Sequence, residues 1–136
     1  MASTHDYESD PRNKDIQIYI NGEYFHRAVA KVSVLDSGFL LGDGVWEGIR
    51  LHKGHLLYLD EHFDRLFNGA AALAMDIDRS REELAQVLKD TLHKNEMDSD
   101  VHIRLIISRG LKNTPYQHPK VIVGKPTLVI IPEYKK

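Results

Sequence analysis

The residues of this sequence that could do chemistry are mainly arginines. Arg65 lies in a segment with helical periodicity, beside Leu66 on the apolar side of that segment. A guanidinium group binds a phosphate or a carboxylate through two parallel hydrogen bonds, so Arg65 is a candidate anion ligand. The simpler alternative is a surface ion pair with Glu61 or Asp64, because exposed helical arginines commonly pair with acidic neighbours.

Charges also interrupt runs of apolar residues that have the character of strands. Strand alternation places Glu47 on one face and Arg50, with Trp46, on the other, and Arg104 breaks a second apolar run. Such a charge usually points to solvent. It is also compatible with an internal ion pair or with the wall of a cleft. Arg109, before a glycine, is either a further anion contact or the end of a strand.

The sequence does not indicate other common kinds of site. No serine, histidine and aspartate show the arrangement of a catalytic triad. Gly42-Asp43-Gly44 is no P-loop, because the lysine and the serine or threonine are missing. The eight histidines are scattered and there is no cysteine, so we expect no metal site. The lack of cysteine also fits a reducing, cytoplasmic compartment.

Charge and hydropathy exclude two classes of partner. The formal net charge is −2, and acidic and basic residues are interspersed. There is therefore no basic face for nucleic acid and no polybasic segment for an anionic membrane surface. No apolar run is long enough to span a bilayer.

Strands and helices must position these candidate residues. Alternating apolar residues predict strands at 16–20, 23–26, 45–51, 55–59, 101–108 and 127–131, with a further possible strand at 29–34. Asn21-Gly22 predicts a tight hairpin, and Pro132 is expected to end the last strand.

Two amphipathic segments predict helices. The first is expected to begin with Asp60 as its N-cap and to reach about Met75. The second should begin with the capping box of Ser80 and Glu83 and reach about Lys94. Strands, then two helices, then strands predict an α+β fold, in which an antiparallel sheet packs on two helices.

The length of the chain predicts one domain or a large part of one. We expect a flexible N-terminal arm at residues 1–15, the domain itself at 16–132 and the start of a linker at 133–136.

The most specific stretch is rich in glycine. It contains Asp36-Ser37-Gly38 and Leu41-Gly42-Asp43-Gly44-Val45-Trp46-Glu47-Gly48-Ile49-Arg50. Further motifs are Ile20-Asn21-Gly22-Glu23, Gly54, His62 with Arg65-Leu66, and Ile107-Ser108-Arg109-Gly110. In this order, over about residues 17–132, they closely resemble the N-terminal domain of class IV, or fold type IV, pyridoxal-phosphate aminotransferases. That family includes branched-chain and D-amino acid aminotransferases, (R)-selective amine transaminases and aminodeoxychorismate lyase.

The resemblance implies roles for particular residues. Arg65 matches the arginine that binds the phosphate of pyridoxal 5'-phosphate, a cofactor that supplies an electron sink while the protein anchors and orients it. Phe39 and Leu41 match positions that reach the substrate pocket, and Arg104 matches an arginine near the substrate carboxylate. The family also implies a homodimer that acts on an amino donor and a 2-oxo acid.

Departures from the family pattern bear on the substrate. Branched-chain enzymes usually have tyrosine at the position of Leu41, and D-amino acid enzymes have tyrosine at that of Phe39. The loop at residues 111–118 lacks the arginine with which D-amino acid enzymes hold a carboxylate. The motif Glu47-Gly48-Ile49-Arg50 is also that of branched-chain enzymes, and it favours a branched-chain-like substrate.

The family's Schiff-base lysine belongs to a second domain that this chain does not contain. We therefore expect no catalytic residue here, and a chain that is inactive alone as the N-terminal part of a longer enzyme. Two alternatives stay open. The reaction could be that of a lyase of the aminodeoxychorismate lyase type. The chain could instead be a stand-alone, non-catalytic module for dimerisation or anion binding.

Overall fold

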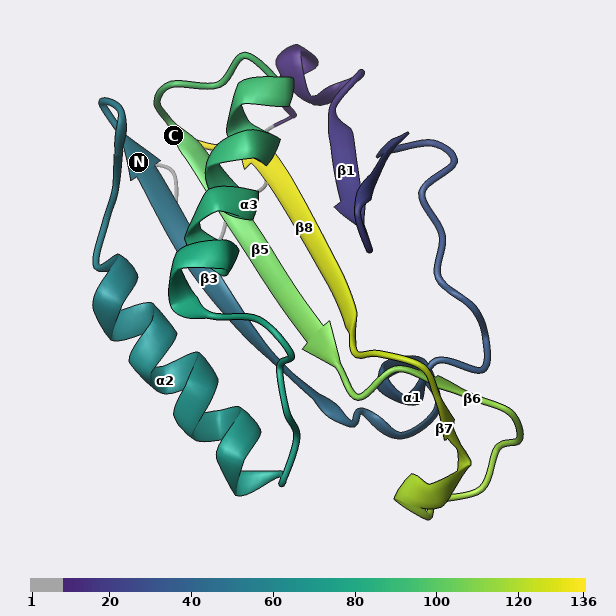
Figure 1. Cartoon of the computed structure of the whole chain (residues 1–136). Helices are drawn as coiled ribbons and strands as arrows, with labels where there is room; N and C mark the ends of the chain where they lie inside the picture. Colours follow the sequence, from purple (N-terminus) through teal and green to yellow (C-terminus); the bar gives the residue numbers. More distant parts are fainter. Residues whose placement is uncertain (1–8) are drawn as a thin grey trace, which may run out of the picture.

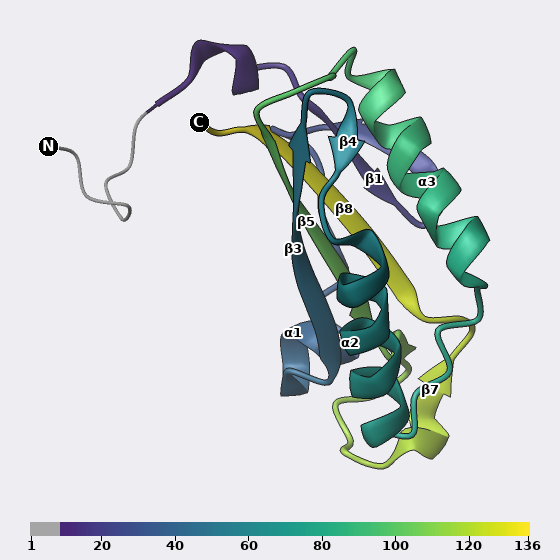
Figure 2. The same ribbon diagram turned by 90° about the vertical axis from the view of Figure 1, so that its left-hand side faces the viewer.

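The computed structural model describes residues 9–136 and has an α+β fold (Figure 1). One antiparallel sheet has the order β2 (Glu23–His26), β1 (Gln17–Ile20), β8 (Thr127–Tyr134), β5 (Val101–Ser108), β3 (Gly44–His52) and β4 (His55–Leu56). Helices α2 (Leu59–Ala72) and α3 (Arg81–Lys94) pack on one face of this sheet, as Figure 2 shows. The predicted antiparallel sheet on two helices is therefore confirmed.

Shorter elements complete the fold. They are η1 (Pro11–Asn13), α1 (Ser37–Leu41), η2 (Pro119–Val121) and a small sheet formed by β6 (Leu111–Lys112) and β7 (Ile122–Val123). Among the described helices, α1 lies on the side of the sheet opposite α2 and α3 (Figure 2). Within residues 9–136, no helix combines the length and the apolar character needed to cross a membrane.

Local sequence signals explain several of these elements. Asn21 and Gly22 both have positive φ, 49° and 96°, as the predicted tight turn between β1 and β2 requires. The predicted capping box of α3 is present, because the Ser80 side chain accepts from the Glu83 N–H and the Glu83 side chain accepts from the Ser80 N–H. These two signals depend only on residues within one turn of each other.

The core lies between the sheet and its two longer helices. Side chains from alternate positions of the strands meet the apolar faces of α2 and α3. The fully buried members of this layer include Ile49, Ile103, Leu105, Ile107, Leu128, Ile130, Leu66, Leu84 and Leu88. The other face of β3 and β5 is therefore not covered by α2 or α3.

Several expected elements and element boundaries are wrong. The possible strand at residues 29–34 does not form. Asp36, which follows these residues, caps α1 by accepting from the Gly38 N–H at 2.8 Å. Tyr58, not Asp60, occupies the N-cap position of α2, and Asp60 lies in the first turn. Strand β4 is also shorter than predicted, since it ends at Leu56.

Strand β8 continues past Pro132 to Tyr134, although Pro132 was expected to end it. Pro132 pairs with Ile103 of β5. On the other side of β8, the pairing with β1 involves only Val129 and Ile130. A proline, which has no N–H, is tolerated where no neighbouring strand needs that donor.

The described part of the expected N-terminal arm is packed against the end of β8. Asn13 is buried, its Nδ2 donates to the Tyr134 carbonyl at 3.0 Å, and the Tyr134 N–H donates to Asn13 Oδ1 at 2.7 Å. Residues 1–8 lie outside the described residues.

Candidate functional site

Arg65 binds a buried carboxylate from the sheet rather than a neighbour on its own helix. Its Nε donates to both oxygens of Glu47, at 3.1 and 2.9 Å, and its Nη2 lies 2.7 Å from Glu47 Oε1. His62 Nδ1 lies 2.7 Å from the same oxygen. The alternative surface pair with Glu61 or Asp64 is not formed within residues 9–136, where Asp64 pairs with Arg81 of α3.

The positions of these residues follow from helix and strand periodicity. His62 and Arg65 are three residues apart on α2 and therefore share a face. Glu47 lies on the helix-facing side of β3, with 3% of its surface exposed. We call Glu47, His62 and Arg65 the Glu47 cluster. The sequence left open whether the charge of Glu47 points to solvent, forms an internal ion pair or lines a cleft. In the structure, Glu47 forms an internal ion pair with Arg65.

The Glu47 cluster shifts the proton equilibria of its members. Burial alone would raise the pKa of Glu47, but hydrogen bonds from Arg65 and then His62, with the charge of Arg65, outweigh burial and lower it. The hydrogen bonds to Glu47 raise the pKa of Arg65 above its ordinary value. Glu47 is therefore an ionised acceptor at neutral pH.

Arg65 keeps the capacity to bind a further anion. Its side chain is 72% exposed although its Nε and Nη2 are bound to Glu47. Its Nη1 donates no hydrogen bond within residues 9–136. Tyr58, Glu61, His62 and Arg65 line a hollow of about 240 Å³. An exposed, oriented guanidinium beside a hollow fits a phosphate group.

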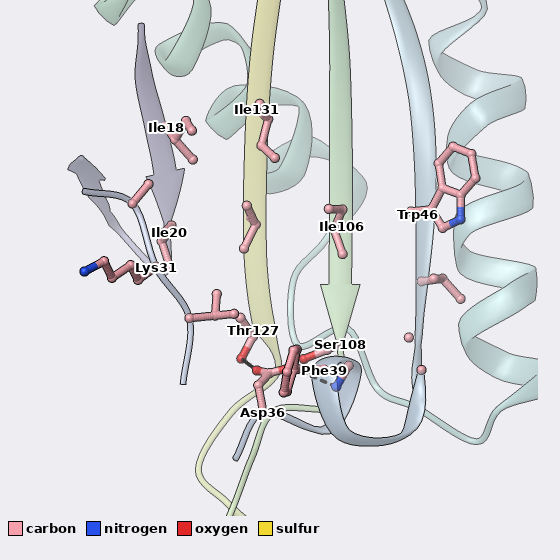
Figure 3. A pocket seen from close by; sticks show the side chains of 17 residues that line it. Ile18, Ile20, Lys31, Asp36, Phe39, Trp46, Ile106, Ser108, Thr127 and Ile131 are labelled. Atoms are coloured by element: carbon pink, nitrogen blue, oxygen red, sulfur yellow. Dashed lines mark hydrogen bonds between the residues drawn. The ribbon is translucent and has the colours of Figure 1, made fainter. Parts of the chain in front are cut away.

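The opposite face of the sheet carries an apolar groove of about 510 Å³ (Figure 3). Its apolar walls are Ile18 and Ile20 of β1, Val129 and Ile131 of β8, Ile106 of β5 and Trp46 of β3. Asp36, Phe39, Ser108 and Thr127 meet at one end of the groove, near α1. The walls of this groove come from strands far apart in the chain, so the sequence does not indicate it.

The three expected substrate residues occupy the same side of the molecule as the groove. Phe39 lines it and is 70% exposed, whereas Leu41 is exposed without lining it. The Arg104 guanidinium lies 4.1 Å from the centre of the Trp46 ring, a cation–π contact at the groove wall. A cation beside an apolar hollow suits a ligand that carries both a carboxylate and an apolar group.

Further charges lie beyond Arg104 on this face. Arg50 donates to the Lys135 carbonyl and has Nη2 3.8 Å from Asp100. Burial lowers the pKa of His102, and the positive charges of Lys135 and Arg104 lower it further. His102 is therefore neutral at neutral pH, so the cations of this face are arginine and lysine side chains.

Arg109 serves the structure and not a ligand. Its Nε lies 2.7 Å from Asp43 Oδ2, and its Nη2 and Nη1 donate to the carbonyls of Leu73 and Ala74 at 2.6 and 3.2 Å. It therefore ties the start of β3 and the end of β5 to the C-terminal end of α2. The alternative of an anion contact for Arg109 is not supported, because these acceptors already occupy its guanidinium.

The structure does not bring Arg65 together with Phe39, Leu41 and Arg104. Arg65 belongs to α2, and Phe39 and Leu41 belong to α1 on the opposite side of the sheet (Figure 2). Arg104 contacts Trp46, which lines the groove on the side of α1. The adjacent residues Trp46 and Glu47 of β3 point to these opposite sides. The described residues 9–136 include no group of three metal-binding side chains.

The comparison with known proteins gives closely related sequences. Branched-chain-amino-acid aminotransferase-like protein 1 of Arabidopsis thaliana is 42% identical over 125 residues, which are 92% of this chain and 22% of that protein. The putative branched-chain-amino-acid aminotransferase of Methanocaldococcus jannaschii is 42% identical over 116 residues, which are 85% of this chain and 39% of that protein. This chain thus spans less than half the length of these two relatives.

Solved structures share the fold. The branched-chain amino acid aminotransferase from Escherichia coli matches with a TM-score of 0.73 and 27% identity. The match covers 88% of this chain and 41% of that chain. A family model described as amino-transferase class IV matches residues 44–126, more than half of the sequence. With the motifs, the fold and these relatives in agreement, the chain belongs to the class IV aminotransferases.

Proposed function

We propose that residues 16–132 are the N-terminal, cofactor-covering domain of a longer aminotransferase that depends on pyridoxal 5'-phosphate. The complete enzyme would transfer an amino group between an amino acid or amine and a 2-oxo acid. The observation that carries the proposal is Arg65, held by Glu47 yet 72% exposed beside a hollow. In the motif of His62 with Arg65-Leu66, Arg65 matches the arginine for which the family resemblance implies binding of the cofactor phosphate.

In catalysis, this chain would anchor and cover the cofactor, and it would not transfer protons. When bound, pyridoxal phosphate supplies the electron sink for the reaction. Arg65 would hold the phosphate through the part of its guanidinium that Glu47 leaves free. We assign no catalytic residue to this chain, because the family's cofactor-binding lysine lies in the second domain.

We further propose a branched-chain-like substrate that contacts the groove face. The groove walls are apolar, and Arg104 places a cation beside Trp46. An apolar substrate side chain would be favoured by burial, and a carboxylate would pair with the guanidinium. Phe39 and Leu41 lack the tyrosine hydroxyl that related enzymes carry at either position.

The separation of Arg65 from Phe39 and Leu41 across the sheet supports a homodimer. If both sets of residues serve one pocket, a second copy could supply one of them, as the family resemblance implies. A cytoplasmic location belongs to the same proposal.

The mass and absorbance of the natural protein test this function. We expect a mass of roughly twice that of this chain and a yellow absorbance band that borohydride abolishes. A protein with the mass of this chain alone that stays colourless with added pyridoxal phosphate would contradict the proposal. That result would favour a non-catalytic module for dimerisation or anion binding.

Substrate profiling then tests the reaction class. We expect amino transfer from L-leucine, L-valine and L-isoleucine to 2-oxoglutarate. Transfer from D-alanine alone would contradict the branched-chain assignment. Cleavage of aminodeoxychorismate without amino transfer would establish a lyase instead.

A further inference from the structure

The Glu47 cluster contains more hydrogen bonds than Arg65 would need merely to bind a phosphate group. Glu47 Oε1 is within 2.7 Å of both His62 Nδ1 and Arg65 Nη2, and Oε2 is 2.9 Å from Arg65 Nε. The carboxylate is buried, and the His62 side chain is mostly buried with it. These contacts join the sheet to α2 directly behind the exposed guanidinium.

We infer that Glu47 and His62 are positioning residues, which orient Arg65 before a phosphate group arrives. The inference rests on the proposed function and extends it, since that function assigns a role to Arg65 alone. Glu47 holds the guanidinium by Nε and Nη2 and so limits its rotation. His62 in turn holds Glu47 Oε1, the oxygen that accepts from Arg65 Nη2.

Arginine needs such support because its side chain is long and exposed here. A free arginine side chain has many rotamers, and a ligand that fixes it must overcome the lost entropy. Where the protein has already fixed the side chain, this cost arises during folding and not during binding. The Glu47 cluster provides this preorganisation at Arg65.

The hydrogen bond of His62 has a defined direction. Glu47 is ionised at neutral pH and can only accept hydrogen bonds. His62 Nδ1 must therefore carry the hydrogen in its 2.7 Å contact with Glu47 Oε1. An asparagine at position 62 can place an N–H donor near the site of Nδ1, whereas leucine has a similar shape and no donor. Glutamine places its donor one bond further out.

These substitutions give a matched test in the natural protein that carries this chain, freed of bound cofactor. The variants are His62→Asn, His62→Leu and His62→Gln, with Arg65→Met as the control that removes the phosphate ligand. Equilibrium dialysis gives the dissociation constants of pyridoxal 5'-phosphate and of pyridoxal, which lacks the phosphate. The ratio of the two constants measures phosphate recognition separately from the fold.

We expect His62→Leu and His62→Gln to reduce the preference for the phosphorylated ligand about 10-fold, with pyridoxal affinity unchanged. This is the scale at which hydrogen-bond partners behind a ligand-binding group act in metal sites. His62→Asn should stay within about 3-fold of the wild type on the same argument. If His62→Leu does not fold, the comparison of asparagine with glutamine decides.

Two results would overturn the inference while leaving the proposed function intact. One is an equal loss of affinity for both ligands, which indicates a purely structural role. The other is a full phosphate preference in His62→Leu or His62→Gln while Arg65→Met loses it. A wild type without phosphate preference, or one unaffected by Arg65→Met, would overturn the proposed function and this inference together.

Discussion

Gly44, at the start of β3, lies where the sheet leaves no room for a side chain. A Cβ at this position would be 2.6 Å from the Ile107 carbonyl oxygen and 3.1 Å from Ser108 Cα. Both are backbone atoms of β5, which is paired with β3 on one side and with β8 on the other. The clash cannot be relieved by a rotamer change, so β3 itself would have to move away.

Gly42, two residues earlier, provides the control. It ends α1 with a φ of 66°, and a Cβ there would meet nothing within 4 Å. Its substitution has only the cost of the left-handed conformation, which is roughly 1 kcal/mol for alanine and less for asparagine. Overpacking against backbone costs about 3 kcal/mol, so Gly44→Ala should be about 2 kcal/mol less stable than Gly42→Ala.

Urea unfolding of the two variants measures this difference. Trp46 is the only tryptophan and lies two residues from Gly44, so its fluorescence reports on β3. With a denaturant slope of about 2 kcal/mol per molar urea, the midpoints should differ by about 1 M. Gly42→Asn should stay near the wild type. Equal midpoints for Gly44→Ala and Gly42→Ala would refute the close-approach argument.

Three further predictions concern charged residues. Lys112 is buried and its Nζ has no hydrogen-bond partner within residues 9–136, so Lys112→Met should raise the unfolding free energy by about 1–3 kcal/mol. Exposed Lys120→Met, the control, should leave the urea midpoint unchanged. Arg109→Ala should lower the unfolding free energy by about 2–3 kcal/mol, because Asp43 and two carbonyls lose their donor. Arg109→Lys should recover less than half of this in the same assay, since one ammonium cannot reach all three acceptors. The Glu47 pKa is lower in the folded than in the unfolded state, where it is near 4.5. The stabilisation from its ionised form should therefore be complete above pH 4.5 and be lost as the pH falls through the folded-state value. The unfolding free energies of the wild type and of Glu47→Gln are measured against pH. If the two curves are parallel below pH 6, the prediction is contradicted.

The sequence predicts best those features whose signals depend on neighbouring residues. The Asn21-Gly22 turn and the capping box of Ser80 and Glu83 need partners no more than three residues away. Boundaries were less predictable. Asp36 could end a strand or cap a helix from its local sequence, and a buried hydrogen bond from Thr127 Oγ1 to its Oδ2, at 2.6 Å, joins it to a strand far along the chain.

In the candidate site too, some features are indicated by short motifs and others depend on contacts between distant residues. By motif, the sequence predicts Arg65 as an anion ligand and Phe39, Leu41 and Arg104 as substrate residues. It assigned no role to His62, and it offered Glu61 or Asp64 as the partner of Arg65 where the structure has Glu47. Pairing with Glu47 requires α2 to pack over β3, which depends on the packing of the whole core.

The sequence by itself determined the fold class, the family and the residue types available for binding, because periodicity, caps and motifs are written in short stretches. Only the tertiary structure decided which charges meet. It buried Glu47 beneath Arg65, used Arg109 to hold the glycine-rich loop and put Trp46 beside Arg104. It also placed Arg65 and the apolar groove on opposite sides of one sheet. The physical reason is that a contact between distant residues depends on which faces pack together, and packing is a property of the whole chain.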